Sequence, residues 1–269
     1  MPMANQQKVA VIGAGVMGEA LIAALIRSGV AGPSIAIVEK REDRCNELIA
    51  RYGITQSPLS EAVAGSDLIL LVVKPQDMQA LLSEIAPAIN KSALVMSFAA
   101  GKTISFIANG LGHSQPIVRI MPNTPTSVGL GAAGYSFGQG VSGDQKAFVA
   151  SLLSAAGVAV EVDESLQDAI TATSGSGPAY FFAFVEAMIE GSVALGISRS
   201  DATTLTIQTI VGSAALLQNS GDSPTTLREK VTSPNGTTAA ALASFSEDHL
   251  TEIVARAMKA ARDRSQELA

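Results

Sequence analysis

Short apolar runs alternate with amphipathic stretches over roughly the first 160 residues of the chain. The runs are rich in β-branched residues and are bounded by Gly, Pro, Asp or Lys, which is typical of buried strands. Alternation of strands and helices at this spacing predicts an α/β fold with a doubly wound parallel sheet. The predicted strands are residues 9–12, 35–38, 68–73, 94–98, 117–120 and 158–162, and the predicted helices are 17–28, 41–51, 75–89, 104–110 and 144–155. The glycine-rich stretch 129–143 carries no predicted element.

After about Asp163 the pattern becomes entirely helical. Ser223 followed by Pro224 indicates one helix start, because a serine cap and a proline in the first turn both favour helix initiation. The predicted helices are residues 165–191, 201–218, 224–231, 237–245 and 247–268. We therefore expect two domains, an α/β domain of residues 1–163 and an all-α domain of residues 164–269.

The helical half is unusually poor in charge. Residues 169–218 contain only four charged side chains, Glu186, Glu190, Arg199 and Asp201. A surface helix of a monomer should carry a broad polar face, so these helices need burial against another subunit. The sequence predicts a homo-oligomer packed through this half across a two-fold axis.

Composition narrows the class of protein further. The chain is 47% hydrophobic with a net charge of −6, which disfavours nucleic acid as a partner. The chain has no run of about 18 apolar residues, so no membrane span is predicted. Its polar start lacks the pattern of a signal peptide. We expect a cytoplasmic protein. With one cysteine and two histidines, no metal site is expected.

The first predicted strand leads directly into a glycine turn, Gly13-Ala14-Gly15-Val16-Met17-Gly18, which opens the first helix. Gly13 permits the tight turn, Gly15 leaves room for a pyrophosphate, and Gly18 allows the helix to pack on the strand. The helix N-terminus offers free N–H groups and a partial positive charge to phosphate. In this strand–turn–helix context, the motif predicts a Rossmann-type site for a nicotinamide dinucleotide.

The residues after the second strand bear on the choice of dinucleotide. The Glu39 carboxylate suits a ribose 2′-hydroxyl, which favours NADH. Lys40, Arg41 and Arg44 follow, and their cations suit a 2′-phosphate. We expect NADPH, with NADH as the alternative.

Three further segments follow predicted strands, at the sheet edge where doubly wound folds bind ligands. They are Val72-Val73-Lys74-Pro75, Ser97-Phe98-Ala99-Ala100-Gly101 and Met121-Pro122-Asn123-Thr124-Pro125. Lys74 is a candidate contact for the cofactor ribose. The small residues Ala99 and Ala100 would let the backbone approach the nicotinamide, and the prolines would fix a loop that aims Asn123.

Two segments of the helical half also carry candidate chemistry. Ser233-Pro234-Asn235-Gly236-Thr237-Thr238 gathers hydroxyls and backbone N–H groups at a helix start, which suits a small carboxylate. An ordinary capped helix start explains the local sequence equally well. Gly175-Ser176-Gly177-Pro178 interrupts a helix, and we interpret it as a kink that also forms the floor of the active site.

Together, these motifs resemble those of pyrroline-5-carboxylate reductase. The set includes residues 175–180, Gly-Ser-Gly-Pro-Ala-Tyr, and the resemblance extends along this chain from Val9 to about Leu268. The last two motifs are the specific ones, since many dehydrogenases share the glycine turn. The resemblance implies reduction of 1-pyrroline-5-carboxylate to L-proline by NAD(P)H, the last step of proline biosynthesis. It also implies a homodimer interleaved through the helical domain, with a decamer as a further assembly.

The resemblance also assigns residues. It places residues 13–18, Val73, Lys74, Pro75, Ala99 and Ala100 on the cofactor, and Ser233, Gly236, Thr237 and Thr238 on the substrate loop. Thr238 matches the threonine that faces the imine nitrogen. Asn235 replaces the first of two glycines; because Asn enters the left-handed region readily, we expect the loop to keep its shape. Lys230, just before the loop, is open to two interpretations, a contact to a cofactor phosphate or exposure to water.

Two alternatives remain at this point. A β-hydroxyacid dehydrogenase has the same turn and a helical domain, but it carries a catalytic lysine in a glycine-rich helical motif, and residues 175–180 contain none. A non-catalytic NAD(P)-binding sensor is the second. Cofactor oxidation that depends on pyrroline-5-carboxylate separates both from a reductase.

Overall fold

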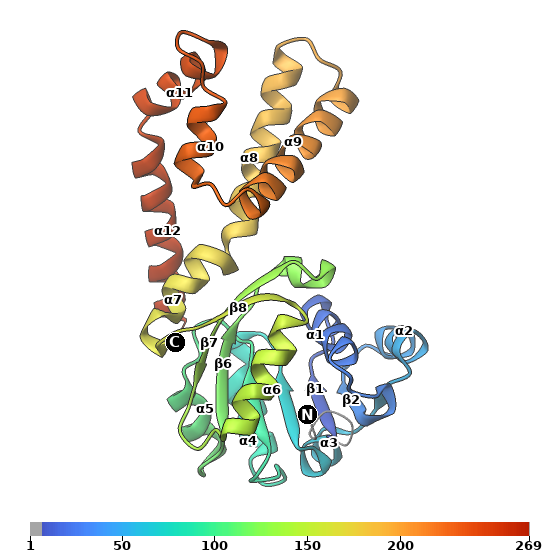
Figure 1. The fold of residues 1–269 in the computed structure, drawn as a ribbon. Helices are drawn as coiled ribbons and strands as arrows, with labels where there is room; N and C mark the ends of the chain where they lie inside the picture. Colours follow the sequence, from blue (N-terminus) through green and yellow to red (C-terminus); the bar gives the residue numbers. More distant parts are fainter. Residues whose placement is uncertain (1–6, 269) are drawn as a thin grey trace. The chain divides into compact units, whose positions relative to one another are not determined.

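The computed structural model describes residues 7–268. Eight strands within this range form one sheet in the order β3-β2-β1-β4-β5-β6-β7-β8 (Figure 1). Their bounds are β1 Val9–Ile12, β2 Ile35–Val38, β3 Thr55–Gln56, β4 Leu68–Leu71, β5 Leu94–Ser97, β6 Ile117–Met121, β7 Gly131–Phe137 and β8 Gly157–Glu161. The mostly parallel sheet confirms the α/β prediction.

The helices of the α/β half cover both faces of this sheet. Val9 and Val11 of β1 pack into one apolar cluster, and Ala10 and Ile12 pack into the other. Burial on both faces is the reason that these strands read as continuous apolar runs rather than alternating ones. The helices are α1 Val16–Arg27, α2 Glu42–Tyr52, α3 Leu59–Gly65, α4 Met78–Ile85, α5 Ile104–Leu111 and α6 Gly143–Ser154.

Three elements of this half correct the sequence analysis. The stretch 129–143 contains β7, which pairs antiparallel with β6, so the expectation of a purely parallel sheet is wrong at this pair. Glycine is required inside β7, because a Cβ on Gly134 would lie 2.7 Å from the Ile170 side chain. The short β3 and α3 also went unpredicted, since neither presents a long periodic run.

The remaining helices include one interruption. Residues 165–191, predicted as a single helix, form a 3-10 turn at Glu164–Leu166, α7 at Gln167–Ile170, a π-helical turn at Thr171–Gly175, and α8. The Ser223 cap is confirmed, because its hydroxyl accepts the Thr226 N–H. The bounds are α8 Gly177–Ala194, α9 Arg199–Asn219, α10 Pro224–Lys230, α11 Thr237–Glu247 and α12 Leu250–Glu267. No helix of the described residues is long and apolar enough to cross a membrane.

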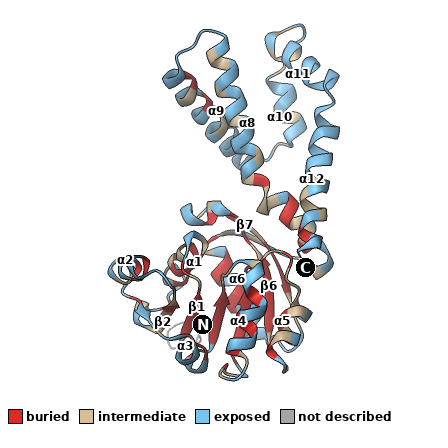
Figure 2. Ribbon diagram, turned by 180° about the vertical axis from the view of Figure 1, so that it is seen from behind, coloured by how far each residue is buried: buried red, intermediate tan, exposed pale blue. Residues whose placement is uncertain are grey.

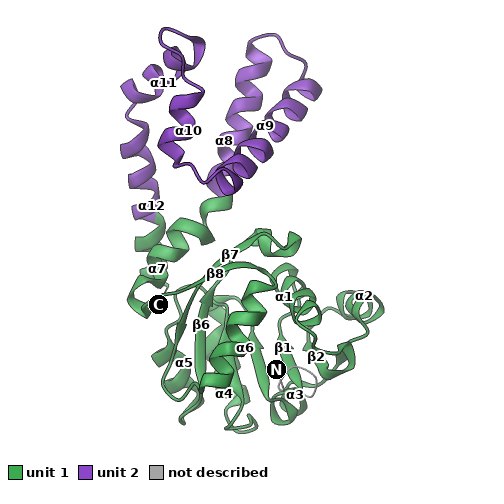
Figure 3. Ribbon diagram, viewed as in Figure 1, with its two compact units in different colours: residues 1–178, 261–269 green, residues 179–260 purple. Residues whose placement is uncertain are grey.

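The chain separates into two compact units, residues 1–178 with 261–269, and residues 179–260 (Figure 3). Within residues 7–268, the last strand ends at Glu161, whereas the compact units divide at residue 178. The change from strands to helices and the division into compact units therefore fall at different places. The domain boundary between residues 163 and 164 therefore stays a prediction.

The second unit has almost no interior. Among residues 179–260, all of which the structure describes, only Ala202 and Thr206 are buried (Figure 2). Large apolar side chains lie on its surface, and Phe181 and Phe182 are each 62% exposed. One copy of this unit therefore leaves its apolar faces uncovered.

Candidate cofactor and substrate sites

The three glycines of the turn after β1 have different surroundings. Gly13 adopts φ +93°, and a Cβ there would lie 2.5 Å from the Val72 carbonyl oxygen. A Cβ on Gly18 would overlap the Gly13 carbonyl oxygen, so this glycine is needed for the helix to approach the turn. A Cβ on Gly15 would meet no atom within 4 Å. The fold itself requires Gly13 and Gly18, whereas Gly15 faces open space.

The start of α1 offers unused donors to that space. Gly15 is the N-cap residue, and no side chain of the described residues caps the helix. The first N–H groups of α1 are therefore free to bind an anion. An open position above free N–H groups fits the pyrophosphate of a dinucleotide.

The segments after the parallel strands meet at one sheet edge. Ile12 of β1 lies beside Val38 of β2 and Leu71 of β4, and Leu71 lies beside Ser97 of β5. Chain order reverses between β1 and β4, the position at which doubly wound sheets bind their ligands. Lys74 is exposed there, Val73, Pro75 and Ala100 are half-buried, and Ala99 is buried. The structure thus brings the predicted segments together; their contact with a cofactor stays a prediction.

Asn123 has a structural role that the sequence did not indicate. Its side chain is buried, and its Oδ1 accepts the Ala132 N–H at 2.9 Å. This bond ties the start of β7 to the loop after β6. A cofactor contact through its side-chain nitrogen stays a prediction.

Glu39 is held firmly at the end of β2. Its carboxylate accepts N–H groups from Ala14 at 3.1 Å, Lys40 at 2.9 Å and Arg41 at 3.1 Å. A pocket of about 430 Å³ adjoins it, lined by Val38, Glu39 and residues 56–59. A pocket beside a fixed carboxylate at this end of the sheet suits an adenosine ribose. Lys40 and Arg41, the next two residues of the chain, are exposed.

Arg44 does not face this pocket, which corrects its proposed role toward a 2′-phosphate. Its guanidinium is buried, donates to the Ala14 carbonyl oxygen at 3.0 Å, and pairs with Glu47 at 2.7 Å and with Glu19. Burial acts to lower the pKa of Arg44, but the hydrogen bonds with Glu19 and Glu47 outweigh it and raise the pKa. Arg44 therefore stabilises the glycine turn through its bond to the Ala14 carbonyl oxygen.

Glu19 completes this cluster. Besides Arg44, its carboxylate accepts from Arg51 at 2.5 Å and from the Tyr52 hydroxyl at 3.0 Å. Burial acts to raise the pKa of Glu19, but these hydrogen bonds, that from Arg44 above all, lower it. The carboxylate is therefore ionised at neutral pH and fixes α1 to α2.

The loop between α10 and α11 has the conformation expected from its sequence. Asn235 adopts φ +59°, which confirms that asparagine enters the left-handed region here. The Gly236 N–H donates to the Ser233 carbonyl oxygen at 3.0 Å, and Gly236 is an N-cap without a side-chain bond to α11. The hydroxyls of Ser233 and Thr238 have no hydrogen-bond partner in the described part of the chain. The loop thus presents free N–H and O–H groups.

Lys230 pairs with Asp222, at 2.6 Å between Nζ and Oδ2. Lys230 is the last residue of α10 and Asp222 precedes the helix, so the lysine is tied back along its own helix. Its side chain is 61% exposed, which agrees with the interpretation that it faces water, and a contact to a cofactor phosphate stays a prediction.

Ser176 follows the π-helical turn in the first unit. Its N–H donates to the Thr171 carbonyl oxygen at 2.7 Å, a bond that spans five residues. A Cβ on Gly175 would lie 2.5 Å from Met121 Cε, so this turn packs on the end of β6. Ser176 therefore lies near the segment that carries Asn123, and its substrate contact stays a prediction.

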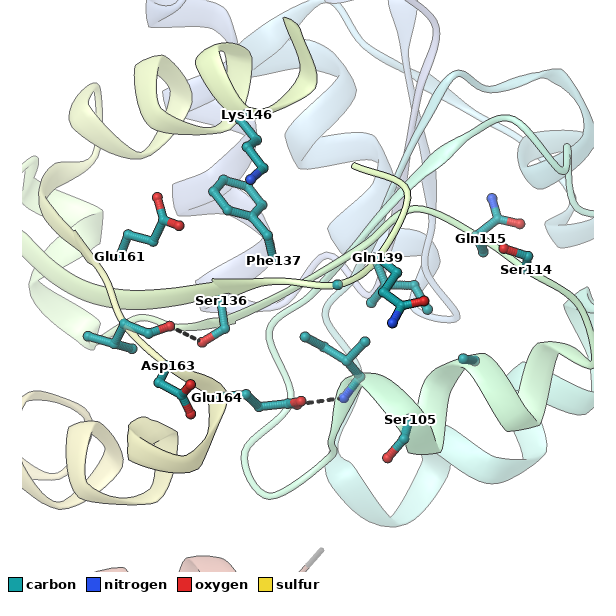
Figure 4. Close-up of a pocket in the computed structure, with 15 residues that line it drawn as sticks. Ser105, Ser114, Gln115, Ser136, Phe137, Gln139, Lys146, Glu161, Asp163 and Glu164 are labelled. Carbon is teal, nitrogen blue, oxygen red and sulfur yellow. Dashed lines mark hydrogen bonds between the residues drawn. The ribbon is translucent and has the colours of Figure 1, made fainter. Parts of the chain in front are cut away.

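A larger pocket of about 910 Å³ lies elsewhere, at the other end of β6 (Figure 4). Ile117, the first residue of β6, lines it together with Phe137, Lys146 and Glu164. It is therefore not the dinucleotide edge, which lies at the carboxyl end of the strand. No cluster of side chains suited to a metal ion occurs among residues 7–268.

A glycine turn at the point where strand order reverses in a mostly parallel sheet, followed by an apolar helical half, is typical of nicotinamide-dependent oxidoreductases. Comparison with known proteins agrees. A family model described as pyrroline-5-carboxylate reductase dimerisation matches residues 164–268, and one described as NADP oxidoreductase coenzyme F420-dependent matches residues 8–101.

The similarity to individual relatives extends over the whole chain. A pyrroline-5-carboxylate reductase of Pseudomonas aeruginosa is 41% identical over 264 residues, which cover 97% of each chain. The solved structure of a pyrroline-5-carboxylate reductase from Coxiella burnetii is 33% identical, with a TM-score of 0.91 over 98% of this chain and 99% of that one. The solved structure of a pyrroline carboxylate reductase from Plasmodium falciparum with NADP bound is 29% identical, with a TM-score of 0.87 over 98% of each chain.

The chain belongs to the pyrroline-5-carboxylate reductase family. It is an oxidoreductase that reduces 1-pyrroline-5-carboxylate to proline with a nicotinamide cofactor. This family membership supports the reductase over the two alternatives left open by the sequence, a β-hydroxyacid dehydrogenase and a non-catalytic NAD(P)-binding sensor.

Proposed function

We propose that the cofactor binds along the carboxyl edge of the sheet. Its pyrophosphate lies on residues 13–18, its adenosine ribose beside Glu39, and its nicotinamide beside Ala99 and Ala100, with Val73, Lys74, Pro75 and Asn123 completing the contacts. The observation that carries this proposal is the open space at Gly15 above the uncapped start of α1. When bound, the nicotinamide supplies the hydride, and the protein holds and orients it.

The loop of residues 233–238 is the proposed substrate site. Free N–H groups at the start of α11 and the hydroxyls of Ser233 and Thr237 suit the substrate carboxylate. Gly236 leaves the helix start uncapped, and Ser176 is proposed as a further contact. The substrate is a cyclic imine whose protonated nitrogen loses its charge on reduction, so a neutral hydroxyl suits that position. Thr238 bonds the ring nitrogen and donates or relays a proton.

Substitution of Thr238 tests this assignment. We expect Thr238→Ala to lower kcat by about tenfold or more, since a positioned proton donor typically contributes about 100-fold to 10,000-fold. Thr238→Ser keeps the hydroxyl and should retain most of the activity, while unfolding curves of both variants match the parent. Unchanged turnover of Thr238→Ala in a pyrroline-5-carboxylate-dependent NADPH oxidation assay would show that Thr238 has no part in the reaction.

NADPH is the proposed cofactor, and NADH is accepted as well. Exposed Lys40 and Arg41, which directly follow Glu39, favour a 2′-phosphate, whereas the fixed Glu39 carboxylate opposes one. These opposing charges predict a modest preference. Glu39→Gln should shift the ratio of the KM values for the two cofactors toward NADPH, and Arg41→Ala should shift it toward NADH. Identical ratios in the parent and both variants would place the 2′-position elsewhere.

We propose a homodimer formed through the helical domain. The support is the uncovered apolar surface of residues 179–260, where Phe181, Leu205 and Val211 are each more than half exposed at 62%, 58% and 55%. The match to a dimerisation family model covers the same region. From the resemblance we further propose that such dimers assemble into a decamer. Sedimentation at micromolar concentration tests both, and a monomer would contradict both.

A further inference from the structure

Arg119 lies on β6 and is almost fully buried, with 4% of its surface exposed. Its guanidinium binds two carboxylates, with one nitrogen for each. The Nη1–Oε1 distance to Glu164 is 3.5 Å, and the Nη2–Oδ1 distance to Asp168 is 3.3 Å. All three residues belong to the first compact unit. Neither the glycine turn nor the substrate loop includes this cluster.

The Glu164 carboxylate holds one end of the loop that follows β5. Its Oε1, the atom that faces Arg119, accepts the Ile104 N–H at 2.7 Å (Figure 4). Ile104 is the first residue of α5. The end of the loop is therefore fixed through Glu164 to Arg119.

The Asp168 carboxylate holds the middle of the same loop through the chain's C-terminal turn. Its Oδ1 accepts the hydroxyl of Ser265, a buried residue, at 2.8 Å. The turn of residues 265–268 lies directly on Gly101, where a Cβ would be 2.9 Å from the Ser265 carbonyl oxygen and 3.0 Å from Leu268 Cβ. Gly101 has φ +75°, so no other residue fits easily.

We propose that Arg119 is a positioning residue that sets the β5–α5 loop, and with it the nicotinamide end of the cofactor, without touching either. The inference rests on the proposed placement of the nicotinamide beside Ala99 and Ala100. Residues 99–101 carry at most a methyl group each, so this stretch of the loop has no long side chain of its own to anchor it. Its position depends on the two carboxylates that one planar guanidinium holds apart. A lysine at this position keeps the charge but cannot bind both carboxylates in a fixed geometry.

Comparing a whole cofactor with a fragment tests this role. The ligands are NADPH and 2′-phospho-ADP-ribose, which lacks the nicotinamide, with affinities measured by calorimetry and kcat measured separately. We expect Arg119→Lys to lower kcat and NADPH affinity by about tenfold or more, because small displacements of a reacting group are costly. Fragment affinity should stay within about twofold, the usual range of effects at a distant site. Ser265→Ala should act in the same direction with a smaller effect, and it keeps the test available should Arg119→Lys fold poorly.

Arg44→Lys is the matched control, since Arg44 is the buried arginine behind the pyrophosphate turn. It should weaken NADPH and the fragment by similar factors. Equal weakening of both ligands by Arg119→Lys and Ser265→Ala, or no change in NADPH affinity and kcat, would overturn the role of Arg119. Fragment binding that is unchanged in both Arg44→Lys and Gly15→Ala would instead overturn the cofactor placement, and the inference with it.

Discussion

Alanine at Gly15 and alanine at Gly18 should separate binding from folding within a single turn. The two glycines are three residues apart, yet a Cβ on Gly18 would overlap the Gly13 carbonyl oxygen, whereas a Cβ on Gly15 would meet nothing within 4 Å. Gly15 also has φ −66°, outside the left-handed region that favours glycine. The structure therefore predicts opposite outcomes for one chemical change.

The magnitudes follow from these surroundings. For Gly18→Ala, backbone must move to admit a methyl group, and such overpacking costs about 1–3 kcal/mol. For Gly15→Ala, loss of the preferred cap residue and reduced freedom of the unfolded chain offset each other, leaving a net change within about 0.5 kcal/mol. The new methyl group would occupy the place proposed for the pyrophosphate. Loss of one charged hydrogen bond there costs about 1.5–3 kcal/mol, which is at least about tenfold in affinity.

Urea unfolding without cofactor measures the first quantity, and a fluorescence titration with NADPH measures the second. We expect Gly15→Ala to be as stable as the parent and to bind NADPH at least about tenfold more weakly. Gly18→Ala should have a lower unfolding free energy. Parent-like NADPH affinity of Gly15→Ala would refute the placement of the pyrophosphate, and parent-like stability of Gly18→Ala would refute the packing argument.

Three further predictions concern other parts of the molecule. Burial acts to raise the pKa of Glu19, but its hydrogen bonds outweigh this and hold the pKa below its ordinary value. The stabilising effect of Glu19 is therefore present above the unfolded pKa and is lost as pH falls through the folded pKa. Glu19→Gln should cost about 1–3 kcal/mol in urea unfolding at neutral pH, and a cost that persists undiminished near pH 3 would contradict this. Asn235→Gly should leave the substrate KM within about twofold, whereas Asn235→Val should lose about 1–2 kcal/mol of stability because β-branched residues resist the left-handed region; a higher KM for Asn235→Gly would show that the asparagine side chain takes part in binding. Phe182→Asp should raise the dimer dissociation constant by about 100-fold or more and shift sedimentation toward monomer, because the buried charge occurs in both subunits. The matched surface variant Gln79→Asp should leave the dissociation constant unchanged, and dimers in both variants would place the interface elsewhere.

The strands of the α/β half were predictable because a strand that is buried on both faces of the sheet has a continuous apolar run in its own sequence. β1 and β2 have the predicted bounds, and β4, β5 and β6 differ from prediction by no more than two residues at either end. β7 escaped because Gly134 is there to admit Ile170, a residue 36 positions later, and local rules interpret glycine as a turn. In the π-helical turn, Gly175 likewise lies against Met121 Cε, a contact that no periodicity records.

The candidate site divides in the same way. The glycine turn and the left-handed Asn235 follow from residue type and neighbouring sequence. The role of Arg44 does not, because two of its three partner atoms are determined by tertiary structure: Ala14 lies in the glycine turn and Glu19 on α1, and only Glu47 is a neighbour on the same helix. Arg119 gave no signal either, since its carboxylates follow 45 and 49 residues later.

Buried arginines thus lie beneath both ends of the proposed cofactor site. Arg44 supports the pyrophosphate turn and Arg119 supports the loop after β5, and each binds two carboxylates. The desolvation of buried charges largely offsets their attraction, so such clusters add little net stability. The glycine turn and residues 99–101 consist mainly of glycine, alanine and one exposed valine, and in the proposed site they would bind the cofactor through backbone groups. A backbone site of this kind needs a rigid support, and a planar guanidinium with two fixed carboxylates supplies one. For both arginines we therefore expect lysine to change cofactor affinity more than the free energy of unfolding.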